Sequence, residues 1–282
     1  MILLTGATGT VGRHLVLELR TASVPFRVLA RDPAKARAAL GPVDAVAGDL
    51  SRPETLAAAL KGVDATFLLS PLEPALASWE AGFARAAKAA GVRRLVKLSA
   101  LGAKPLAKTA IARWHGDAEE EVRRSGVPFI FLRPAAFYQN LLQNAASLRR
   151  GTLAAPMGTA RVAMVDARDV AAAAAAALTG NVRDGETLTL TGPTPQTYAE
   201  LAAAFAEATG RPVHYSDVEP AAALRGMLEA GAPAWLADAV LELAADFREG
   251  RADLATSDVR LSTGREPTPF SRFLRDHASA FA

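Results

Sequence analysis

Three glycines near the start of the chain are the residues whose spacing most directly indicates chemistry. Gly6, Gly9 and Gly12 stand three residues apart and follow the apolar run 1–4 directly. The run predicts a buried strand, and apolar residues at helical spacing after the glycines predict a helix. The backbone N–H groups at the start of such a helix face outward, and the helix dipole favours negative charge there. This pattern predicts a dinucleotide-binding turn rather than a glycine turn that binds nothing.

Each glycine has a separate expected role in that turn. Gly6 allows backbone angles closed to other residues. Gly9 has no side chain to hold off a pyrophosphate, and Gly12 lets the helix lie close to the strand. The expected cofactor contacts from the turn and the first helical turn are Gly6, Thr8, Gly9, Thr10, Val11 and Gly12.

Arg31 indicates which dinucleotide is bound. It follows the predicted strand 26–30, where NAD-binding units place an acidic residue for the ribose hydroxyl. A guanidinium binds a 2′-phosphate bidentately, whereas an acid would repel it. Arg31 and Lys35, one helical turn later, therefore predict NADP(H). Two alternatives stay open: Arg31 is only a solvated charge, or the adjacent Asp32 pairs with it.

Residues after the third and fourth predicted strands complete the expected cofactor site. Asp49 follows the strand 43–47 and is placed either to reach the adenine edge or to shape a turn. The other cofactor contacts expected from these strand ends are Leu50, Leu69 and Ser70.

Strands and helices alternate through the first half of the chain, which predicts an α/β fold with a doubly wound parallel sheet. We predict an NAD(P)-binding domain of the Rossmann type over residues 1–155, with later segments near 161–192 returning to it. Residues 156–282 are expected to form mainly a smaller, mostly helical substrate-binding portion. Capping boxes are predicted at 51–54 and 197–200, and one helix at 137–150.

Composition excludes several classes of protein. Half of the 282 residues are apolar, the net charge is +3 and there is no cysteine, which excludes disulfides and thiolate chemistry. The longest apolar stretch, 170–178, is too short to span a bilayer. No signal peptide is expected, since the chain opens on a core strand, so we predict a cytoplasmic protein. There is no basic stripe with interleaved aromatics for nucleic acid and no histidine cluster for a metal.

The chain resembles the NmrA-like branch of the atypical short-chain dehydrogenases/reductases. It is most similar to the type 2 quinone oxidoreductases and to triphenylmethane reductase. The resemblance covers nearly the whole length. It rests on the segments 5–12, 29–35, 125–134, 137–140 and 256–267.

Ordinary members of that superfamily use a tyrosine and a lysine four residues later, with a serine, to move a proton. This chain departs from that pattern. The residues four positions beyond Tyr138, Tyr198 and Tyr215 are Leu142, Ala202 and Glu219. No lysine follows Lys108 in the chain. Quinones and cationic dyes need less help, because they accept hydride readily and a hydroquinone anion can take its proton from water.

Two residues are the catalytic candidates. His115 lies on the helix where the lysine would be expected. It either orients substrate or relays a proton, or it is simply a partly exposed helix histidine beside Trp114. Ser99 ends the fifth predicted strand, near the position of the family's serine. Trp114, Phe137 and Tyr138 either form an aromatic wall for a flat substrate or pack in the core. Asn140 either binds substrate or ties its loop to the sheet.

The resemblance and the NADP(H) site together predict an oxidoreductase that transfers hydride directly from NADPH to a quinone or a similar planar acceptor. The protein is expected as a monomer or homodimer. One alternative is a non-catalytic sensor that binds NADP(H) and reports its redox state to a partner protein. A weaker one is an isomerase or ether reductase, of which ether reduction is disfavoured because the expected lysine is missing.

Overall fold

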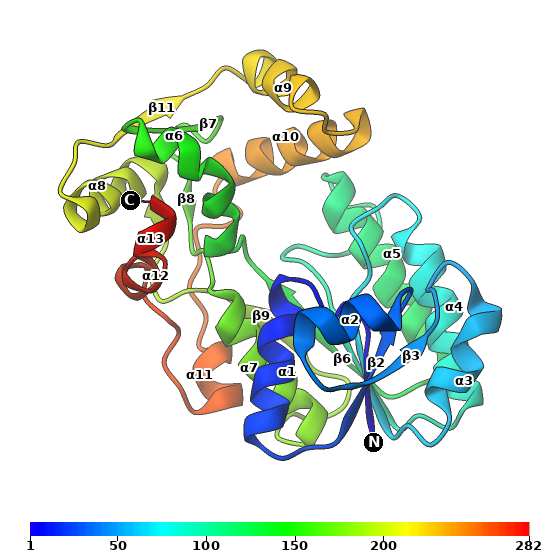
Figure 1. Ribbon diagram of the computed structural model, residues 1–282. Helices are drawn as coiled ribbons and strands as arrows, with labels where there is room; N and C mark the ends of the chain where they lie inside the picture. Colours follow the sequence, from blue (N-terminus) through cyan, green and yellow to red (C-terminus); the bar gives the residue numbers. More distant parts are fainter. Residues whose placement is uncertain (282) are drawn as a thin grey trace.

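The computed structural model describes residues 1–281, and its centre is a seven-stranded sheet (Figure 1). All pairings in this sheet are parallel, and the strand order is β3-β2-β1-β4-β5-β6-β9. This confirms the predicted α/β fold with a parallel sheet. The strands are β1 (Ile2–Leu4), β2 (Phe26–Ala30), β3 (Asp44–Ala47), β4 (Ala65–Leu68), β5 (Arg94–Leu98), β6 (Phe129–Pro134) and β9 (Thr187–Leu190).

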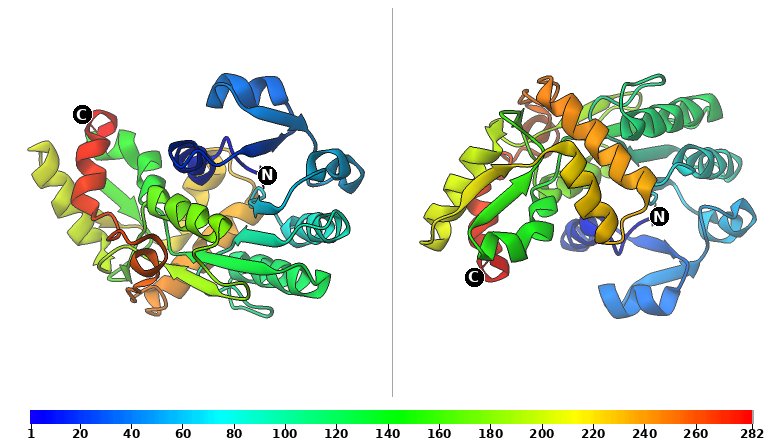
Figure 2. Two further views of the ribbon diagram at one scale, coloured as in Figure 1. Left: turned by 90° about the horizontal axis from the view of Figure 1, so that it is seen from below. Right: turned by 90° about the horizontal axis from the view of Figure 1, so that it is seen from above.

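Helices cover both faces of the sheet, because each face of a parallel sheet is apolar and must be buried. One face carries α1 (Thr10–Thr21), α2 (Pro33–Leu40) and α7 (Ala167–Thr179). The other carries α3 (Leu56–Leu60), preceded by the 3₁₀ turn η1 (Pro53–Thr55), with α4 (Leu76–Ala89) and α5 (Ala110–Ser125). The views in Figure 2 show the two layers on either side of the strands.

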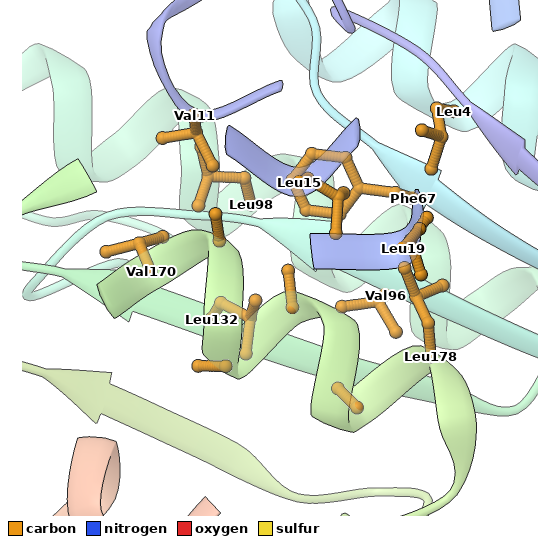
Figure 3. Packing of buried hydrophobic residues seen from close by; sticks show 14 of the residues in the cluster. Leu4, Val11, Leu15, Leu19, Phe67, Val96, Leu98, Leu132, Val170 and Leu178 are labelled. Carbon is orange, nitrogen blue, oxygen red and sulfur yellow. The ribbon is translucent and has the colours of Figure 1, made fainter. Parts of the chain in front are cut away.

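The core under α1 and α7 holds the glycine turn in place (Figure 3). Leu15 and Leu19 of α1 are fully buried, as is Val170 of α7, and they pack on the strand residues of this face. Helix α7 is rich in buried alanines, whose small side chains let it lie close to α1. Leu4 and Val11, on either side of the turn, belong to the same cluster. The turn is therefore anchored at both ends.

The remaining segments build a second apolar cluster beside the sheet, at the upper left of Figure 1. The chain after β6 passes through η2 (Tyr138–Asn144) and α6 (Ala145–Arg149) into two small sheets. In these, β7 (Thr152–Ala155) pairs with β11 (His214–Asp217), and β8 (Arg161–Val162) with β10 (Gln196–Thr197). The helices are α8 (Tyr198–Thr209), α9 (Pro220–Glu229), α10 (Ala234–Arg248), α11 (Asp258–Thr263), α12 (Phe270–Asp276) and α13 (Ala278–Phe281).

Local expectations failed at two places. The single helix predicted over 137–150 is a 3₁₀ segment followed by a short α-helix. Tyr138 and Leu141, three residues apart, both point into the second cluster, which suits three residues per turn. The capping box predicted at 51–54 is wrong, because no side chain caps that helix start, whereas the box formed by Thr197 and Glu200 is confirmed.

Candidate functional site

The glycine turn has the geometry that phosphate binding requires. Gly6 has φ +61°, and a Cβ there would lie 2.7 Å from Leu69 Cγ. A Cβ on Gly12 would clash with the backbone of Gly6 and Ala7, so this glycine lets α1 press against the turn. At Gly9 a Cβ would meet only Gly6 O, at 3.3 Å, so its outer side is open.

The start of α1 leaves donors free for an anion. Gly9 is the N-cap residue and has no capping side chain. Within residues 1–281, the backbone N–H groups of Thr10, Val11 and Gly12 have no backbone acceptor. Free N–H groups at a helix N-terminus, together with the helix dipole, form an anion site. The turn therefore fits a pyrophosphate.

A cavity of about 990 Å³ opens beside this turn at the carboxyl ends of β1, β2, β3 and β4. This is the edge at which open parallel sheets bind nucleotides. Nine of the twelve residues predicted to contact the cofactor line it. They are Gly6, Thr8, Gly9, Arg31, Lys35, Asp49, Leu50, Leu69 and Ser70. Thr10, Val11 and Gly12 do not line it but form the first turn of α1.

Arg31 lies at the edge of the cavity with an exposed guanidinium. The adjacent Asp32 does not pair with it, because its carboxylate caps α2 by accepting from the N–H groups of Ala34 and Lys35. Asp32 also lies 3.8 Å from Lys35 Nζ. Arg31 forms no ion pair or hydrogen bond within residues 1–281. One alternative left open by the sequence, an Asp32–Arg31 pair, is therefore wrong.

Asp49 shapes a turn at the far side of the cavity. Its carboxylate accepts from the N–H and the hydroxyl of Ser51, both at under 3 Å. These bonds, followed by the charges of Arg31 and Arg52, hold the pKa of Asp49 below its ordinary value. Thr55 Oγ1 accepts from Asp49 N and fixes the same turn. Asp49 thus performs the turn role and still lines the cavity.

A buried polar chain begins at the cavity. Ser70 Oγ donates to Glu80 Oε1 at 2.7 Å, and Glu80 Oε2 forms an ion pair with Lys97 Nζ at 2.8 Å. The side chains of Glu80 and Lys97 are fully buried. Lys97 Nζ lies 3.1 Å from His115 Nδ1. This row of polar side chains connects the end of β4 with α4, β5 and α5.

Burial shifts the pKa values of two groups in this row of polar side chains, Glu80 and His115. It raises the pKa of Glu80, although Lys97 opposes the shift. It lowers the pKa of His115 well below 6.5, and the ammonium of Lys97 lowers it further. His115 is therefore a neutral imidazole at neutral pH, and it is half-buried in α5.

Residues 6–181 match the NAD(P)H-binding family. The chain is 41% identical in sequence to the NAD(P)H azoreductase of Xenophilus azovorans, in an alignment that covers all of this chain and 99% of the azoreductase. The chain belongs to the NAD(P)H-binding family. It is an NmrA-like atypical short-chain dehydrogenase/reductase, as the resemblance implied.

The fold is similar to that of two solved reductases. The structure of the Escherichia coli quinone oxidoreductase complexed with NADPH superposes with a TM-score of 0.89 and a sequence identity of 28%. The superposition covers 98% of this chain and 99% of the oxidoreductase. The Citrobacter triphenylmethane reductase complexed with NADP(H) superposes with a TM-score of 0.85 and a sequence identity of 27%, over 98% of this chain and 99% of the reductase. The expected NADP(H) cofactor and the oxidoreductase class are confirmed.

In this NmrA-like reductase, Ser99 does not have the predicted geometry of a catalytic residue. It is buried, and its hydroxyl donates to Glu119 Oε1 at 2.6 Å. Glu119 also accepts from Arg133 of β6 and from Arg123 of α5. The serine hydroxyl is committed to this structural cluster between the sheet and α5. On α5 itself, Ile111 stands four residues before His115, where the tyrosine of a Tyr/Lys pair would stand.

The four predicted substrate residues separate in the structure. Trp114 is half-exposed, and its ring meets Trp235 of α10 edge to face, with centroids 5.7 Å apart. Tyr138 is 1% exposed and packs against Phe270 and Phe273, so its place in a substrate wall is wrong. Burial raises its pKa above the ordinary value. Phe137 is partly buried against the core under α7, and Asn140 is exposed.

The alternative that Asn140 ties its loop to the sheet is not what the structure shows. Its neighbour Gln139 instead ties the loop to the start of helix α7, donating to Asp166 and accepting from Ala167 N. Asn140 makes no side-chain hydrogen bond within the described part of the chain, so a substrate contact for it stays a prediction.

The sequence interpretation missed Lys97, Glu80, Trp79 and Trp235. A lysine between Val96 and Leu98 in a buried strand is an anomaly that could have identified Lys97. Trp79 lines the cofactor cavity from α4. No comparable signal marked Glu80 or Trp235, since both depend on how separate elements pack.

Among residues 1–281, no group of three or more His, Cys, Asp or Glu is placed to hold a metal ion. No helix in the same range has both the length and the apolar character needed to cross a membrane.

Proposed function

We propose that this protein is an NADPH-dependent reductase that transfers hydride directly to a quinone, an azo compound or a similar planar acceptor, without a Tyr/Lys pair. The observation that carries this proposal is the cofactor cavity. It combines an open glycine turn with Arg31, a guanidinium that has no partner within residues 1–281. The azo and quinone reductases to which the chain is similar support the class of acceptor.

In this proposal one set of residues binds the cofactor and another contacts the acceptor. When bound, NADPH supplies the hydride. The N–H groups at the start of α1 would hold the pyrophosphate, and Arg31 with Lys35 would hold the 2′-phosphate. His115 would hydrogen-bond the acceptor as it gains negative charge, with Asn140 as a further candidate contact.

We assign acceptor binding mainly to residues 156–282, together with α5. Trp114 and Trp235 are half-exposed and come from either side of the junction between the sheet and this portion. Two indole rings suit a flat aromatic acceptor. This division of the chain, the monomeric or homodimeric state and a cytoplasmic location are parts of the proposal.

The test is NADPH consumption by purified protein with a panel of benzoquinones, naphthoquinones, azo dyes and triphenylmethane dyes. We expect protein-dependent consumption with at least one class, and NADPH to be preferred over NADH. Consumption no faster than in protein-free mixtures across the whole panel would refute the proposal.

A second candidate is a non-catalytic sensor of the NADPH/NADP⁺ ratio. Two observations favour it: the Ser99 hydroxyl is bonded to Glu119 in a structural cluster, and no tyrosine stands four residues before His115. A sensor would bind NADP⁺ and NADPH with clearly different affinities in calorimetry and would show no turnover. Turnover with any acceptor on the panel would exclude the purely non-catalytic role.

A further inference from the structure

Three partners surround the Lys97 ammonium: an ion pair with Glu80 and hydrogen-bond contacts to Leu98 and His115. Glu80 Oε2 lies at 2.8 Å, the carbonyl oxygen of Leu98 at 3.1 Å and His115 Nδ1 at 3.1 Å. An ammonium group can donate three hydrogen bonds and accept none. Because Lys97 is fully buried and paired with Glu80, its direction is set from two sides and its third proton points at the imidazole.

This contact determines which ring nitrogen of His115 carries the proton. Nδ1 faces a donor, so it must supply the lone pair. A neutral imidazole has one protonated nitrogen, which is then Nε2. The Lys97 charge and the buried setting together keep the ring neutral.

The other ring nitrogen is available to a ligand. His115 Nε2 makes no hydrogen bond within residues 1–281. His115 is also partly exposed, so its ring is not sealed within the core. It is thus an N–H donor with no acceptor among the described residues, next to Trp114 in the sequence.

We propose that Lys97, held by Glu80 and through it by Ser70, is a positioning residue that fixes His115 as the Nε2–H tautomer. His115 then donates a hydrogen bond to the oxygen or nitrogen of the acceptor that becomes negatively charged on hydride addition. A neutral imidazole serves as such a donor where its surroundings disfavour the cation. The role of His115 toward the acceptor rests on the proposed function, whereas the tautomer does not.

The tautomer is measured first, on the protein without cofactor, by ¹⁵N NMR of histidine-labelled protein at pH 7. Loss of signals in His115→Phe assigns the ring. We expect a protonated Nε2 and an unprotonated, hydrogen-bonded Nδ1. A protonated Nδ1, or a cationic ring, would overturn the proposal.

The matched variant is Glu80→Gln with Lys97→Met, which removes both charges of the buried pair and leaves neither uncompensated. We expect it to fold, to bind NADPH within about twofold of the original protein, and to show His115 exchanging between tautomers. Its kcat is expected to fall about tenfold or more, the lower range for loss of a catalytic hydrogen bond. Lys97→Arg, which retains the donor and the charge, is expected to restore part of the rate, and it serves as the second variant if the double one does not fold.

Coupling to His115 separates positioning from a structural role. In a His115→Phe background, the Glu80→Gln/Lys97→Met change is expected to alter kcat by less than about twofold, since the group it positions is gone. An equal loss with and without His115 would contradict the proposal. If the protein turns over no acceptor, the proposed function fails, and the NMR result still decides whether Lys97 sets the tautomer.

Discussion

The rings of Trp114 and Trp235 meet edge to face with their centroids 5.7 Å apart. Trp114 belongs to α5 of the sheet, whereas Trp235 belongs to α10 of the C-terminal portion. Contacts between these helices continue away from the ring pair. Glu242 of α10 accepts from Ala110 N at the start of α5. The pair therefore lies where the two portions of the chain join.

Trp235→Leu is expected to raise the KM for a planar acceptor about three- to tenfold, the worth of one aromatic contact. The affinity for NADPH should stay the same, since Trp235 does not line the cofactor cavity. Steady-state kinetics at saturating NADPH measures the first quantity and fluorescence titration the second. Trp79→Phe is the matched control, because Trp79 lines that cavity and should affect NADPH instead. An unchanged acceptor KM in Trp235→Leu would remove the indole from the acceptor site.

Arg31→Ala is expected to weaken NADPH about 10- to 100-fold, because hydrogen bonds to a charged phosphate are lost. NADH lacks the 2′-phosphate, so its affinity should change by less than about twofold. Calorimetric titration of both cofactors checks this. Arg183→Ala is the control, since that side chain is 93% exposed and pairs only with Glu186 among the described residues. Equal losses for NADPH and NADH would contradict the phosphate role.

Two glycines of the turn should respond differently to alanine. At Gly9, φ is −78° and a Cβ has only one neighbour, Gly6 O at 3.3 Å, so Gly9→Ala should fold normally and bind NADPH poorly. Gly12→Ala should lose about 1–3 kcal/mol or more of the free energy of unfolding, because its Cβ meets backbone. Thermal unfolding without cofactor distinguishes them. Gly226→Ala, in a helix with open space around the new Cβ, should be neutral or stabilising. A Gly12→Ala protein as stable as Gly9→Ala would refute the packing role.

Acidification should destabilise the fold partly through His115. Its pKa is lowered from 6.5 in the folded state by burial and then by Lys97, so the unfolded chain binds the proton more readily. Stability attributable to this residue is present above pH 6.5 and falls as the pH drops below it. Denaturant unfolding between pH 7.5 and 5 should show a shallower decline in His115→Phe than in the original protein. His14, whose pKa burial also lowers, contributes in the same direction and remains in both proteins. Identical slopes would mean that His115 titrates normally.

The cofactor site could be predicted from sequence because its signals are local. Gly6 to Gly12 and Arg31 each follow a strand whose apolar run is visible, and the ends of parallel strands meet at one edge of the sheet. The polar chain could not be predicted in this way. Glu80, Lys97 and His115 lie on three different elements, and only their packing brings them together.

The same reason explains the errors. Tyr138 follows a strand and precedes Asn140, which suits a pocket wall, but Phe270 and Phe273 from the far end of the chain cover it. The sequence does not predict the strand β7, because this strand depends on pairing with β11, about 60 residues later, and carries no pattern of its own. Ser99 has the expected position, yet its hydroxyl turns toward Glu119 of α5.

The most direct test of direct hydride transfer is the isotope effect with NADPH deuterated at either face of nicotinamide C4. The acceptor is the one reduced fastest in the panel, and the reaction is followed in a single turnover by the loss of NADPH absorbance. We expect one deuterated face to slow the reaction with a primary isotope effect and the other to leave it nearly unchanged. NADPH bound without any acceptor-dependent oxidation, or oxidation equally fast with both deuterated forms and with ordinary NADPH in that single turnover, would contradict direct transfer at this site.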